Sequence, residues 1–506
     1  MSFHRPHIAL PQESCAAFLC EIAIRNPDRT ALVFEGATIT YGALARQVDG
    51  AKARLTGLGL GPGNRIGIAL PTGPDYVVQA IAALDLGAVV VPLYDSAPAA
   101  EMRAKCSAAQ VDAMIVEPTA VDRRRGELAL LSGPPQLLSS GERLAGTLPQ
   151  TIPAPKPDDL AFLPFSSGTT GEPKLILLSH RNVLASRLLF AQATALRATS
   201  VLVHFLPLSH VYGWMALTAA LGVGAQIVLH ARYQFEQVVA DIERFRATSV
   251  FAVSQTIIDL ERADSRVAKK LESMQWVNTG SAPLAPAIMR NVAERYGFAI
   301  TTGYGLTEAA PVTHSAVELP ELIDVEAVGY AAADTVLRLV DPNDPERPTP
   351  TGEPGELIVS GPQVSTGYSH ADGRLDRSSW LSDGGFRTGD LVECDSLGRY
   401  RIVGRLKNII KYKGYSVAPA ELEALLGSHP GILDCVVVGR ADPEAGEIPT
   451  AFVVPRQKAR LTSDQVIAYV RERVAPQRRV RDVVFVDQIP RSSAGKVLTR
   501  ELLERV

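Results

Sequence analysis

Residues 166–174, with the sequence SSGTTGEPK, carry the strongest local chemical signal in the chain. The hydroxyls and backbone amides of such a glycine-containing loop can surround phosphate oxygens, and Lys174 adds a mobile positive charge. The spacing differs from the GxxxxGK of a Walker A loop, and the other Gly-Lys pair, Gly495-Lys496, has Pro490 where that motif needs glycine. The loop therefore indicates phosphate binding through a different motif, with a polar surface turn as the structural alternative.

Four further motifs follow, at residues 303–308 (GYGLTE), 386–390 (FRTGD), 404–414 (GRLKNIIKYKG) and 490–496 (PRSSAGK). In this order, and together with residues 166–174, they resemble the adenylate-forming superfamily of acyl-CoA synthetases, peptide-synthetase adenylation domains and luciferases. The resemblance covers essentially the whole chain. It implies an ATP-dependent ligase that converts a carboxylic acid to an acyl-adenylate, releases pyrophosphate and transfers the acyl group to coenzyme A. The implied cofactors are ATP, Mg²⁺ and coenzyme A.

The expected chemistry explains why the motif residues are of these types. A carboxylate that attacks the α-phosphorus of ATP builds negative charge on phosphoryl oxygens, which cations and a metal ion stabilise. The resemblance implies that Lys496 bridges the carboxylate and the α-phosphate, that Thr307 holds the α-phosphate and that Glu308 associates with Mg²⁺. It also implies that Tyr304 stacks on adenine and that Asp390 accepts both ribose hydroxyls. The other implied nucleotide-binding residues are Ser166, Ser167, Gly168, Thr169, Thr170, Gly171, Lys174, Gly280, Ser281, Ala282, Pro283, Gly303 and, as the second ribose contact, Arg405.

Taken singly, these residues have ordinary structural roles as alternatives. Tyr304 would serve as a core aromatic, Glu308 as a charge at a helix N-terminus and Asp390 as a turn residue. The neighbouring motifs favour the functional interpretation of all three. Thr302 stands where the superfamily more often has glutamine or asparagine, so we assign it no contact with adenine.

The segment 404–414 would explain how one chain carries out two half-reactions. In the superfamily, a small C-terminal domain swings about one residue and presents first the lysine near the C-terminus, then a glycine-containing loop. Lys407 occupies the hinge position. Lys411 would take a catalytic role on the loop that faces the acyl-adenylate after rotation, and Lys413 and Gly414 would lie on its coenzyme A side.

Among relatives, the acyl pocket most resembles that of 4-coumarate–CoA ligases. His210 matches the residue that guards the route to the carboxylate, with a satisfied core histidine as the alternative. The positions that match the lining of the phenylpropanoid pocket are Tyr212, Gly280, Gly305, Pro311 and Val312. The two glycines would leave a flat slot, and Tyr212 would stack on a ring or hydrogen-bond to it. An aromatic acid is therefore the expected substrate, with a medium-chain fatty acid as the alternative.

Three departures from the usual pattern surround this pocket. Ala310 replaces a glycine before Pro311, Leu175 replaces a glycine after Lys174, and Ser281 replaces an alanine. The added bulk of Ala310 close to the pocket argues against plain coumarate and leaves a smaller aromatic acid open.

Short apolar strand patterns alternate with helical patterns in the first half of the chain. Helical spacing over 76–86 is followed by strand patterns at 88–93, 113–116, 200–205 and 227–229. Continuous apolar strands between helices favour parallel sheets covered on both faces. The apolar stretch 214–229 is too short for a membrane span and predicts a buried helix that runs into a strand.

The pattern changes from about residue 341. Residues 341–352 are dense in turn formers and an alternating run follows, which predicts a smaller β-rich layer. The last segment predicts α+β structure, with helices at 419–426 and 463–474 and strands at 433–438 and 483–486. We therefore expect an α/β fold with two domains. Residues 1–404 would form a large AMP-binding domain of layered sheets plus the β-rich layer, and residues 405–506 a small mobile α+β domain.

Composition narrows the remaining choices. The 506 residues exceed one core, and 51 basic against 54 acidic side chains give no field that would attract nucleic acid or an anionic membrane. Five scattered cysteines without CxxC spacing fit idle thiols in a reducing compartment, and residues 1–14 lack the apolar stretch of a secretory signal, so we expect a cytoplasmic location. The alternatives to a coenzyme A ligase are an adenylation enzyme that loads a carrier-protein phosphopantetheine, an enzyme with another nucleophile as acceptor, or a degenerate relative without activity.

Overall fold

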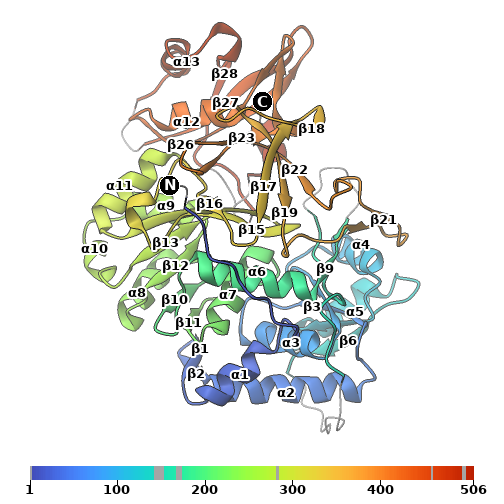
Figure 1. The fold of residues 1–506 in the computed structure, drawn as a ribbon. Coiled ribbons are helices and arrows are strands. Elements are labelled where there is room, and N and C mark those ends of the chain that lie inside the picture. The colour runs from blue at the N-terminus through green and yellow to red at the C-terminus, as the bar shows by residue number, and fades with distance from the viewer. Residues whose placement is uncertain are drawn as a thin grey trace.

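The computed structural model describes residues 3–141, 153–166, 174–280, 284–456, 460–492 and 497–505. Within these residues the largest sheet has nine strands in the order β16-β15-β14-β13-β12-β10-β11-β1-β2 (Figure 1). Their bounds are Tyr330–Ala331 (β16), Ala309–His314 (β15), Ala299–Leu306 (β14), Trp276–Thr279 (β13), Ser249–Ala252 (β12), Val201–His204 (β10), Gln226–Leu229 (β11), Thr30–Phe34 (β1) and Ala37–Thr40 (β2). Strands β1, β11, β10, β12, β13 and β14 run parallel, and β2, β15 and β16 are antiparallel additions at the two edges.

A second sheet has six strands in the order β6-β5-β3-β4-β7-β9. Their bounds are Gln136–Ser139 (β6), Ala113–Val116 (β5), Arg65–Ala69 (β3), Val89–Pro92 (β4), Leu160–Phe162 (β7) and Leu178–Ser179 (β9). All neighbouring pairs are parallel except β7 and β9. The predicted strands at 88–93, 113–116, 200–205 and 227–229 are therefore confirmed, and both sheets are mostly parallel, as expected.

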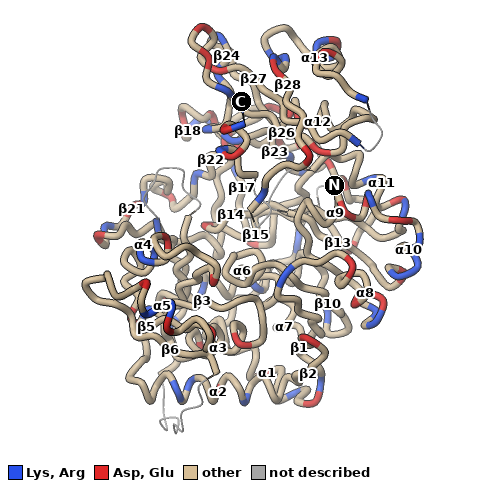
Figure 2. The backbone as a smooth tube through the Cα atoms, turned by 180° about the vertical axis from the view of Figure 1, so that it is seen from behind, with Lys and Arg blue, Asp and Glu red and all other residues tan. Residues whose placement is uncertain are grey.

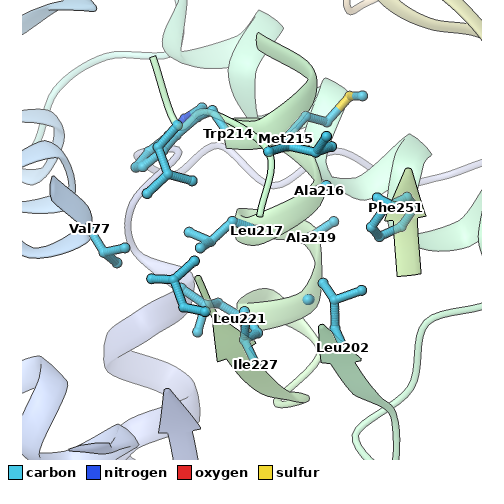
Figure 3. Packing of buried hydrophobic residues seen from close by; sticks show 14 of the residues in the cluster. Val77, Leu202, Trp214, Met215, Ala216, Leu217, Ala219, Leu221, Ile227 and Phe251 are labelled. Carbon is cyan, nitrogen blue, oxygen red and sulfur yellow. The ribbon is translucent and has the colours of Figure 1, made fainter. Parts of the chain in front are cut away.

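Helix α7 (Val211–Gly222) joins the two sheets into one core. Trp214 on this helix stacks on Phe162 of β7, with ring centroids 6.1 Å apart and an interplanar angle of 11°. Figure 3 shows Leu217 on the same helix between Val77 on one side and Leu202 on the other. The buried helix that runs into a strand was predicted from the apolar stretch 214–229, and the structure confirms it as α7 followed by β11.

The remaining helices of the first three hundred residues cover the outer faces of the sheets or lie beside α7 (Figure 1). Their bounds are Phe18–Arg25 (α1), Tyr41–Gly57 (α2), Pro74–Asp85 (α3), Ala99–Ala109 (α4), Val121–Leu128 (α5), His180–Ala193 (α6), Phe235–Phe245 (α8), Ser254–Arg262 (α9), Val267–Lys270 (α10) and Pro286–Tyr296 (α11). Helix α6 contacts β15 of the larger sheet and β7 and β9 of the smaller one, so it also lies between the two layers.

The predicted β-rich layer is confirmed as two antiparallel sheets. One has the order β18-β17-β19-β22-β23, with bounds Asp344–Pro348 (β18), Val336–Asp341 (β17), Gly355–Ser360 (β19), Phe386–Cys394 (β22) and Tyr400–Arg405 (β23). The other joins β21 (Leu375–Asp376), β20 (Tyr368–Ser369) and β8 (Leu175–Ile176). The second sheet matters for the site, because it ties the end of the phosphate loop to the β-rich layer.

The C-terminal segment is α+β, as predicted. Its sheet consists of Tyr415–Val417 (β25), Ile410–Tyr412 (β24), Gly446–Pro455 (β27), Ile432–Asp442 (β26) and Asp482–Phe485 (β28), and its helices are Pro419–Gly427 (α12), Ser463–Arg471 (α13) and Thr499–Leu503 (α14). This segment rests on α9 of the larger part. Ile258 packs in a cluster with Leu433 and Phe452, and Arg456 pairs with Glu261 at 2.8 Å.

Three buried histidines make the stability of this fold sensitive to acid. Burial lowers the pKa values of His180 and His204 to about 4 and that of His314 to about 3. The unfolded chain takes up these protons near pH 6.5, so from there down to about pH 4 the unfolded state binds more protons than the folded state. We expect the free energy of unfolding to fall across this window by up to about 1.4 kcal/mol per pH unit for each histidine. Urea unfolding curves at about pH 7.5, 6 and 5 measure this slope.

Glu423 acts in the opposite direction. Burial raises its carboxyl pKa to about 7, so the folded state takes up this proton before the unfolded state does. Between pH 7 and about pH 4.5, the ordinary pKa of a glutamate, Glu423 therefore raises the free energy of unfolding as the pH falls. This offsets the effect of about one of the histidines. A free energy of unfolding that stays constant or rises from pH 6.5 to pH 4 would contradict the neutral, buried state of the three histidines.

Candidate active site

The predicted site residues gather where parallel strands of the larger sheet end. Strands β10, β13 and β14 run in the same direction and are linked through β12, so their carboxyl ends lie along one edge of the sheet. His210 and Tyr212 follow β10, Gly280 follows β13, and Tyr304 lies near the end of β14. Ligands of open parallel sheets bind outside the carboxyl ends of the strands, which makes this edge the candidate site.

Tyr304, Asp390 and Arg405 form one bonded group at this edge. The Tyr304 hydroxyl donates to Asp390 Oδ2 at 2.5 Å, and Arg405 Nε lies 2.7 Å from Asp390 Oδ1. Asp390 and Arg405 are direct cross-strand partners of β22 and β23, which explains why residues fifteen positions apart meet. Burial raises the pKa of the Asp390 carboxyl, and the guanidinium of Arg405 opposes that rise. The group presents a carboxylate with charged and aromatic neighbours, as a ribose and base site requires.

Two side chains hold the strand that carries Asp390. Arg387 donates to both oxygens of Glu356, whose side chain is 3 % exposed, and Thr388 donates to the Leu357 carbonyl at 2.8 Å. Both bonds tie β22 to β19, and Thr388 Oγ1 also accepts from the Asp390 amide. No role was predicted from the sequence for Arg387 and Thr388 of the FRTGD motif. Their contacts make them supports of Asp390.

Thr307 and Glu308 form the turn between the antiparallel strands β14 and β15, where Leu306 pairs with Ala309. Glu308 accepts a hydrogen bond on Oε1 from the Tyr368 hydroxyl at 2.7 Å. The Tyr368 ring in turn lies 5.4 Å from Lys174 Nζ, which donates to Asp376 Oδ2 at 3.1 Å. The small sheet of β8, β20 and β21 thus connects the last residue of the phosphate loop with the carboxylate expected at the metal.

Tyr368 and Asp376 were not predicted from the sequence to belong to the site. Each lies in a two-residue strand, and Tyr368 is sixty residues from the glutamate that it contacts, so no local spacing pointed to it. Hydrogen bonds from Ser378, and then from Lys174, hold the pKa of Asp376 well below its usual range. Asp376 is therefore an anionic partner for Lys174 at neutral pH.

The residues expected on the acyl side, His210, Tyr212 and Gly280, lie at the same edge of the sheet as Tyr304. His210 is the N-cap of α7 and accepts the Tyr212 amide on Nδ1 at 3.2 Å. A Cβ placed on Gly280 would lie 3.8 Å from Tyr212 Cζ and 3.9 Å from its hydroxyl oxygen, which is ordinary contact distance. The missing side chain of Gly280 therefore leaves a gap about one methyl group wide against the end of the phenol ring.

Gly305 corrects the expectation that both glycines open the slot. A Cβ on Gly305 would lie 3.2 Å from the Cβ of Ala310, so that space is already taken by the neighbouring strand. Pro311 and Val312 continue this strand, and Val312 is fully buried in the cluster under the β-rich layer. Of the two glycines, Gly280 is the one that leaves room beside Tyr212.

Thr302 also behaves as expected from its departure from the usual motif. Its hydroxyl donates to the Ala327 carbonyl at 2.6 Å and lies 3.1 Å from the Ser315 hydroxyl. These contacts give Thr302 a structural role behind the strand.

The predicted hinge and the predicted thioester-side loop are separated in this conformation. Lys407 lies in the turn Leu406–Asn408 directly after β23. Burial raises the pKa of the Asp390 carboxyl, and the charge of Lys407, like that of Arg405, opposes this rise, so Lys407 lies near Asp390. Lys411 donates through its amide to Glu447 and through Nζ to Ser416, both within the C-terminal segment. Figure 2 shows β24, the strand that leads to Lys413 and Gly414, at the far end of that segment from β14.

Several predicted site residues lie outside the described residues. They are Ser167, Gly168, Thr169, Thr170 and Gly171 of the phosphate loop, Ser281, Ala282 and Pro283 of the adenine-side turn, and Lys496. Ser166 and Lys174, which flank the loop, are described, and the Ser166 amide donates to the Lys174 carbonyl at 2.9 Å. The two ends of the phosphate loop are therefore joined at its base.

Comparison with known proteins now decides the family. The family model for the AMP-binding enzyme matches residues 20–369, and the model for the AMP-binding enzyme C-terminal domain matches residues 421–496. The chain belongs to the AMP-binding enzymes. It is 31% identical over 523 residues to 4-coumarate–CoA ligase 5 of Oryza sativa subsp. japonica, with 98% of this chain and 95% of the relative covered.

Two solved structures of AMP-binding enzymes show the same arrangement over nearly the whole chain. ATP-bound MatB from Rhodopseudomonas palustris superposes with a TM-score of 0.90 at 25% identity, covering 98% of this chain and 99% of that chain. The amide bond synthetase McbA from Marinactinospora thermotolerans superposes with a TM-score of 0.85 at 26% identity, covering 97% and 99%. This AMP-binding enzyme is an AMP-forming acid–thiol ligase, which activates a small carboxylic acid with ATP and transfers the acyl group to coenzyme A.

The residues present fit a magnesium ion that is held mainly by the nucleotide. The described part of the chain contains no group of three or more His, Cys, Asp or Glu side chains that could hold a metal on their own. Mg²⁺ in nucleotide sites is typically bound by one or two carboxylates together with phosphate oxygens and water. Glu308 in the β14–β15 turn would supply one such carboxylate.

Figure 2 shows Lys and Arg positions interspersed with Asp and Glu positions along the backbone. Among the described helices, none combines the length and the apolar character needed to cross a membrane.

Proposed function

We propose that this AMP-binding enzyme is an aryl-CoA ligase, which takes an aromatic carboxylic acid as its substrate. The observation that supports this substrate class is the gap beside Gly280, which faces the end of the Tyr212 ring. A flat ring fills a gap of this shape without bending, whereas an alkyl chain would have to order several rotatable bonds to do so. The relative named 4-coumarate–CoA ligase 5 acts, by its name, on an aromatic acid.

The roles of the chain's own groups follow from their chemistry. Asp390 and Arg405 would bind the ribose hydroxyls and Tyr304 would cover the adenine. Lys174, held by Asp376, would lie at the phosphates, and Lys496 would stabilise the charge that develops as the carboxylate attacks. Mg²⁺ at Glu308 would neutralise phosphoryl oxygens when it is bound.

We further propose that the domain boundary lies at the end of β23, with residues 1–404 as the AMP-binding domain and residues 405–506 as a mobile domain hinged at Lys407. The position of β24, far from β14, is that expected before the thioester-forming rotation. In the rotated state Lys411, Lys413 and Gly414 would approach the acyl-adenylate.

The acid is identified by pyrophosphate release from ATP across benzoate-type, cinnamate-type and straight-chain acids, with and without coenzyme A. We expect kcat/KM to be largest for an aryl acid and coenzyme A to be required for sustained turnover. Faster turnover of octanoate than of every aryl acid would overturn the aromatic assignment. Because McbA is an amide bond synthetase, a simple amine is tested as a second acceptor. A carrier protein bearing phosphopantetheine is tested as a third.

Gly280→Ala is the matched test of the slot. Its new Cβ would make only ordinary contacts, 3.5 Å from the Gly303 carbonyl oxygen and 3.8 Å from Tyr212 Cζ, so the fold should tolerate it. We expect KM for the aryl acid to rise at least about tenfold, because a methyl group fills the slot, while KM for ATP stays within about twofold. Gly50→Ala on α2, where a Cβ would meet nothing within 4 Å, is the control and should match the wild type. An equal rise for aryl and straight-chain acids would show that Gly280 does not select for a ring.

A further inference from the structure

The Tyr212 hydroxyl is bound inside the protein. It donates to Asn278 Oδ1 at 2.8 Å, on β13 directly below Gly280. Asn278 is 1 % exposed, so this bond is shielded from water. A phenol has one hydrogen to donate, and here that hydrogen is already used. The sequence predicts that Tyr212 either stacks on the substrate or hydrogen-bonds to it. In this arrangement the Tyr212 hydroxyl has no hydrogen left to donate to the substrate.

The orientation of Asn278 is fixed by its other partners. Burial lowers the pKa of His314 to about 3, so its ring is neutral and carries one hydrogen. Its Nδ1 lies 2.9 Å from the Ser315 carbonyl, which only accepts, so Nδ1 donates and Nε2 accepts. The Asn278 atom 2.8 Å from Nε2 is therefore the donating Nδ2, which also lies 3.1 Å from Thr301 Oγ1, and Oδ1 is left to accept from Tyr212. Every polar atom along this chain has a partner of the matching kind.

The far end of the chain is anchored by the N-terminal segment. The guanidinium of Arg5 donates through Nη2 to the carbonyls of His314 and Ser315, both at 2.9 Å, and through Nη1 to the carbonyl of Ala331 at 3.0 Å. The Ser315 carbonyl therefore accepts from Arg5 as well as from His314. Arg5 and Ser315, which are more than three hundred positions apart in the sequence, thus belong to the same hydrogen-bond network as Tyr212.

Aromatic rings and a glycine pack closely around the network. Phe190 of α6 meets both Tyr212 and His314 edge to face, with centroids 6.2 Å and 6.1 Å away. A Cβ on Gly303 would lie 2.9 Å from His314 Cδ2, so the glycine of the nucleotide strand is needed to admit the imidazole. His314 therefore lies between the adenine-side strand and the residue that lines the acyl pocket.

We propose that Asn278 and His314 are positioning residues of the acyl pocket, which hold Tyr212 as a wall that cannot donate a hydrogen bond to the acid. This inference rests on the proposed acyl pocket and adds the device that sets its chemistry. The pocket end at Tyr212 then gives no advantage to an acid that carries a hydrogen-bond acceptor there.

The test compares acids of the same shape that differ in an acceptor. The aryl pair is 4-acetylbenzoate and 4-isopropylbenzoate, and the straight-chain pair is 5-oxohexanoate and 5-methylhexanoate. The measured quantity is the ratio of kcat/KM within each pair, which a general loss of stability leaves unchanged. For the wild type and for Tyr212→Phe we expect the same ratio, because the hydroxyl does not serve the substrate.

Asn278→Leu should change that ratio. It removes the Oδ1 acceptor at 2.8 Å and leaves the Tyr212 hydroxyl only the backbone carbonyl of residue 278, 3.4 Å away. The acceptor-bearing acid should then compete for this hydrogen and gain about tenfold over its partner. Adding Tyr212→Phe to Asn278→Leu should return the ratio to the wild-type value. Thr313→Val, which deletes a buried hydroxyl bonded to the Val328 carbonyl in the segment before β16, is the control and should leave the ratio unchanged.

Two results would overturn the proposal. One is a wild-type ratio that already favours the acceptor-bearing acid and falls in Tyr212→Phe, which needs no Asn278 variant and so remains decisive if Asn278→Leu does not fold. The other is an unchanged ratio in folded Asn278→Leu. If only the straight-chain pair is turned over, the aromatic assignment fails while the role of Asn278 is still decided by that pair.

Discussion

Lys496→Ala should lower the rate of acyl-adenylate formation by roughly 10²–10³, which corresponds to about 3–4 kcal/mol of transition-state stabilisation. The loss is expected because the ammonium group would neutralise charge that develops on the phosphoryl oxygens during attack. Acid-dependent exchange of labelled pyrophosphate into ATP measures this half-reaction. A second assay supplies a chemically synthesised acyl-adenylate and follows its reaction with coenzyme A, which should proceed within about threefold of the wild-type rate.

The comparison of the two half-reactions separates a catalytic role from a structural one. A misfolded or destabilised variant would lose both reactions together, and an equal loss in both would refute the assignment of Lys496 to adenylation. Lys270→Ala is the control, because Lys270 lies at the surface near Glu243 on α8 and should affect neither reaction.

Asp390→Ala should raise KM for ATP by roughly 10²-fold, since a charged acceptor is worth about 1.5–3 kcal/mol for each hydrogen bond that it makes. The substitution removes the group that would accept from the ribose and also leaves the Arg405 guanidinium and the Tyr304 hydroxyl without their shared partner. Steady-state kinetics with ATP as the varied substrate give the effect.

A nucleotide without ribose hydroxyls isolates the contact itself. The wild type should bind 2′,3′-dideoxy-ATP much more weakly than ATP, whereas Asp390→Ala should bind the two nucleotides about equally. Asp390→Asn keeps the shape and one acceptor oxygen, so its preference for ATP over 2′,3′-dideoxy-ATP should lie between those of the wild type and Asp390→Ala. If Asp390→Ala discriminates between the two nucleotides as strongly as the wild type, Asp390 has only a structural role in β22, as the partner of Arg405 and Tyr304.

The sequence was a good guide wherever function is concentrated in contiguous motifs. Asp390 and Arg405 were both predicted to contact the ribose because each stands in its own motif. The register of β22 and β23 brings the two residues into contact. The buried helix α7 and the strand after it were predictable because a continuous apolar run has few other destinations. The α+β end of the chain followed from its separate alternating and helical patterns.

The parts that could not be predicted depend on contacts between distant segments. Tyr368 reaches Glu308 through a strand of two residues, which has no periodicity to detect. Asn278 and His314 look like ordinary strand residues in the sequence, and their roles appear only when β13 and β15 lie on either side of β14. The correction at Gly305 has the same origin, because the space beside a glycine depends on which side chain the neighbouring strand places there.

The contact between Arg456 and Glu261 bears on how fast the enzyme can cycle. Under the proposed hinge motion, this ion pair and the packing of Ile258 would be broken and remade once in every turnover. Glu261 would not be stranded when Arg456 leaves, because Arg295 lies 3.8 Å from its other carboxylate oxygen and also donates to its backbone carbonyl. A carboxylate that keeps one cation throughout lets the other leave at low cost, so under this motion the ion pair would act as a reversible contact between the two proposed domains.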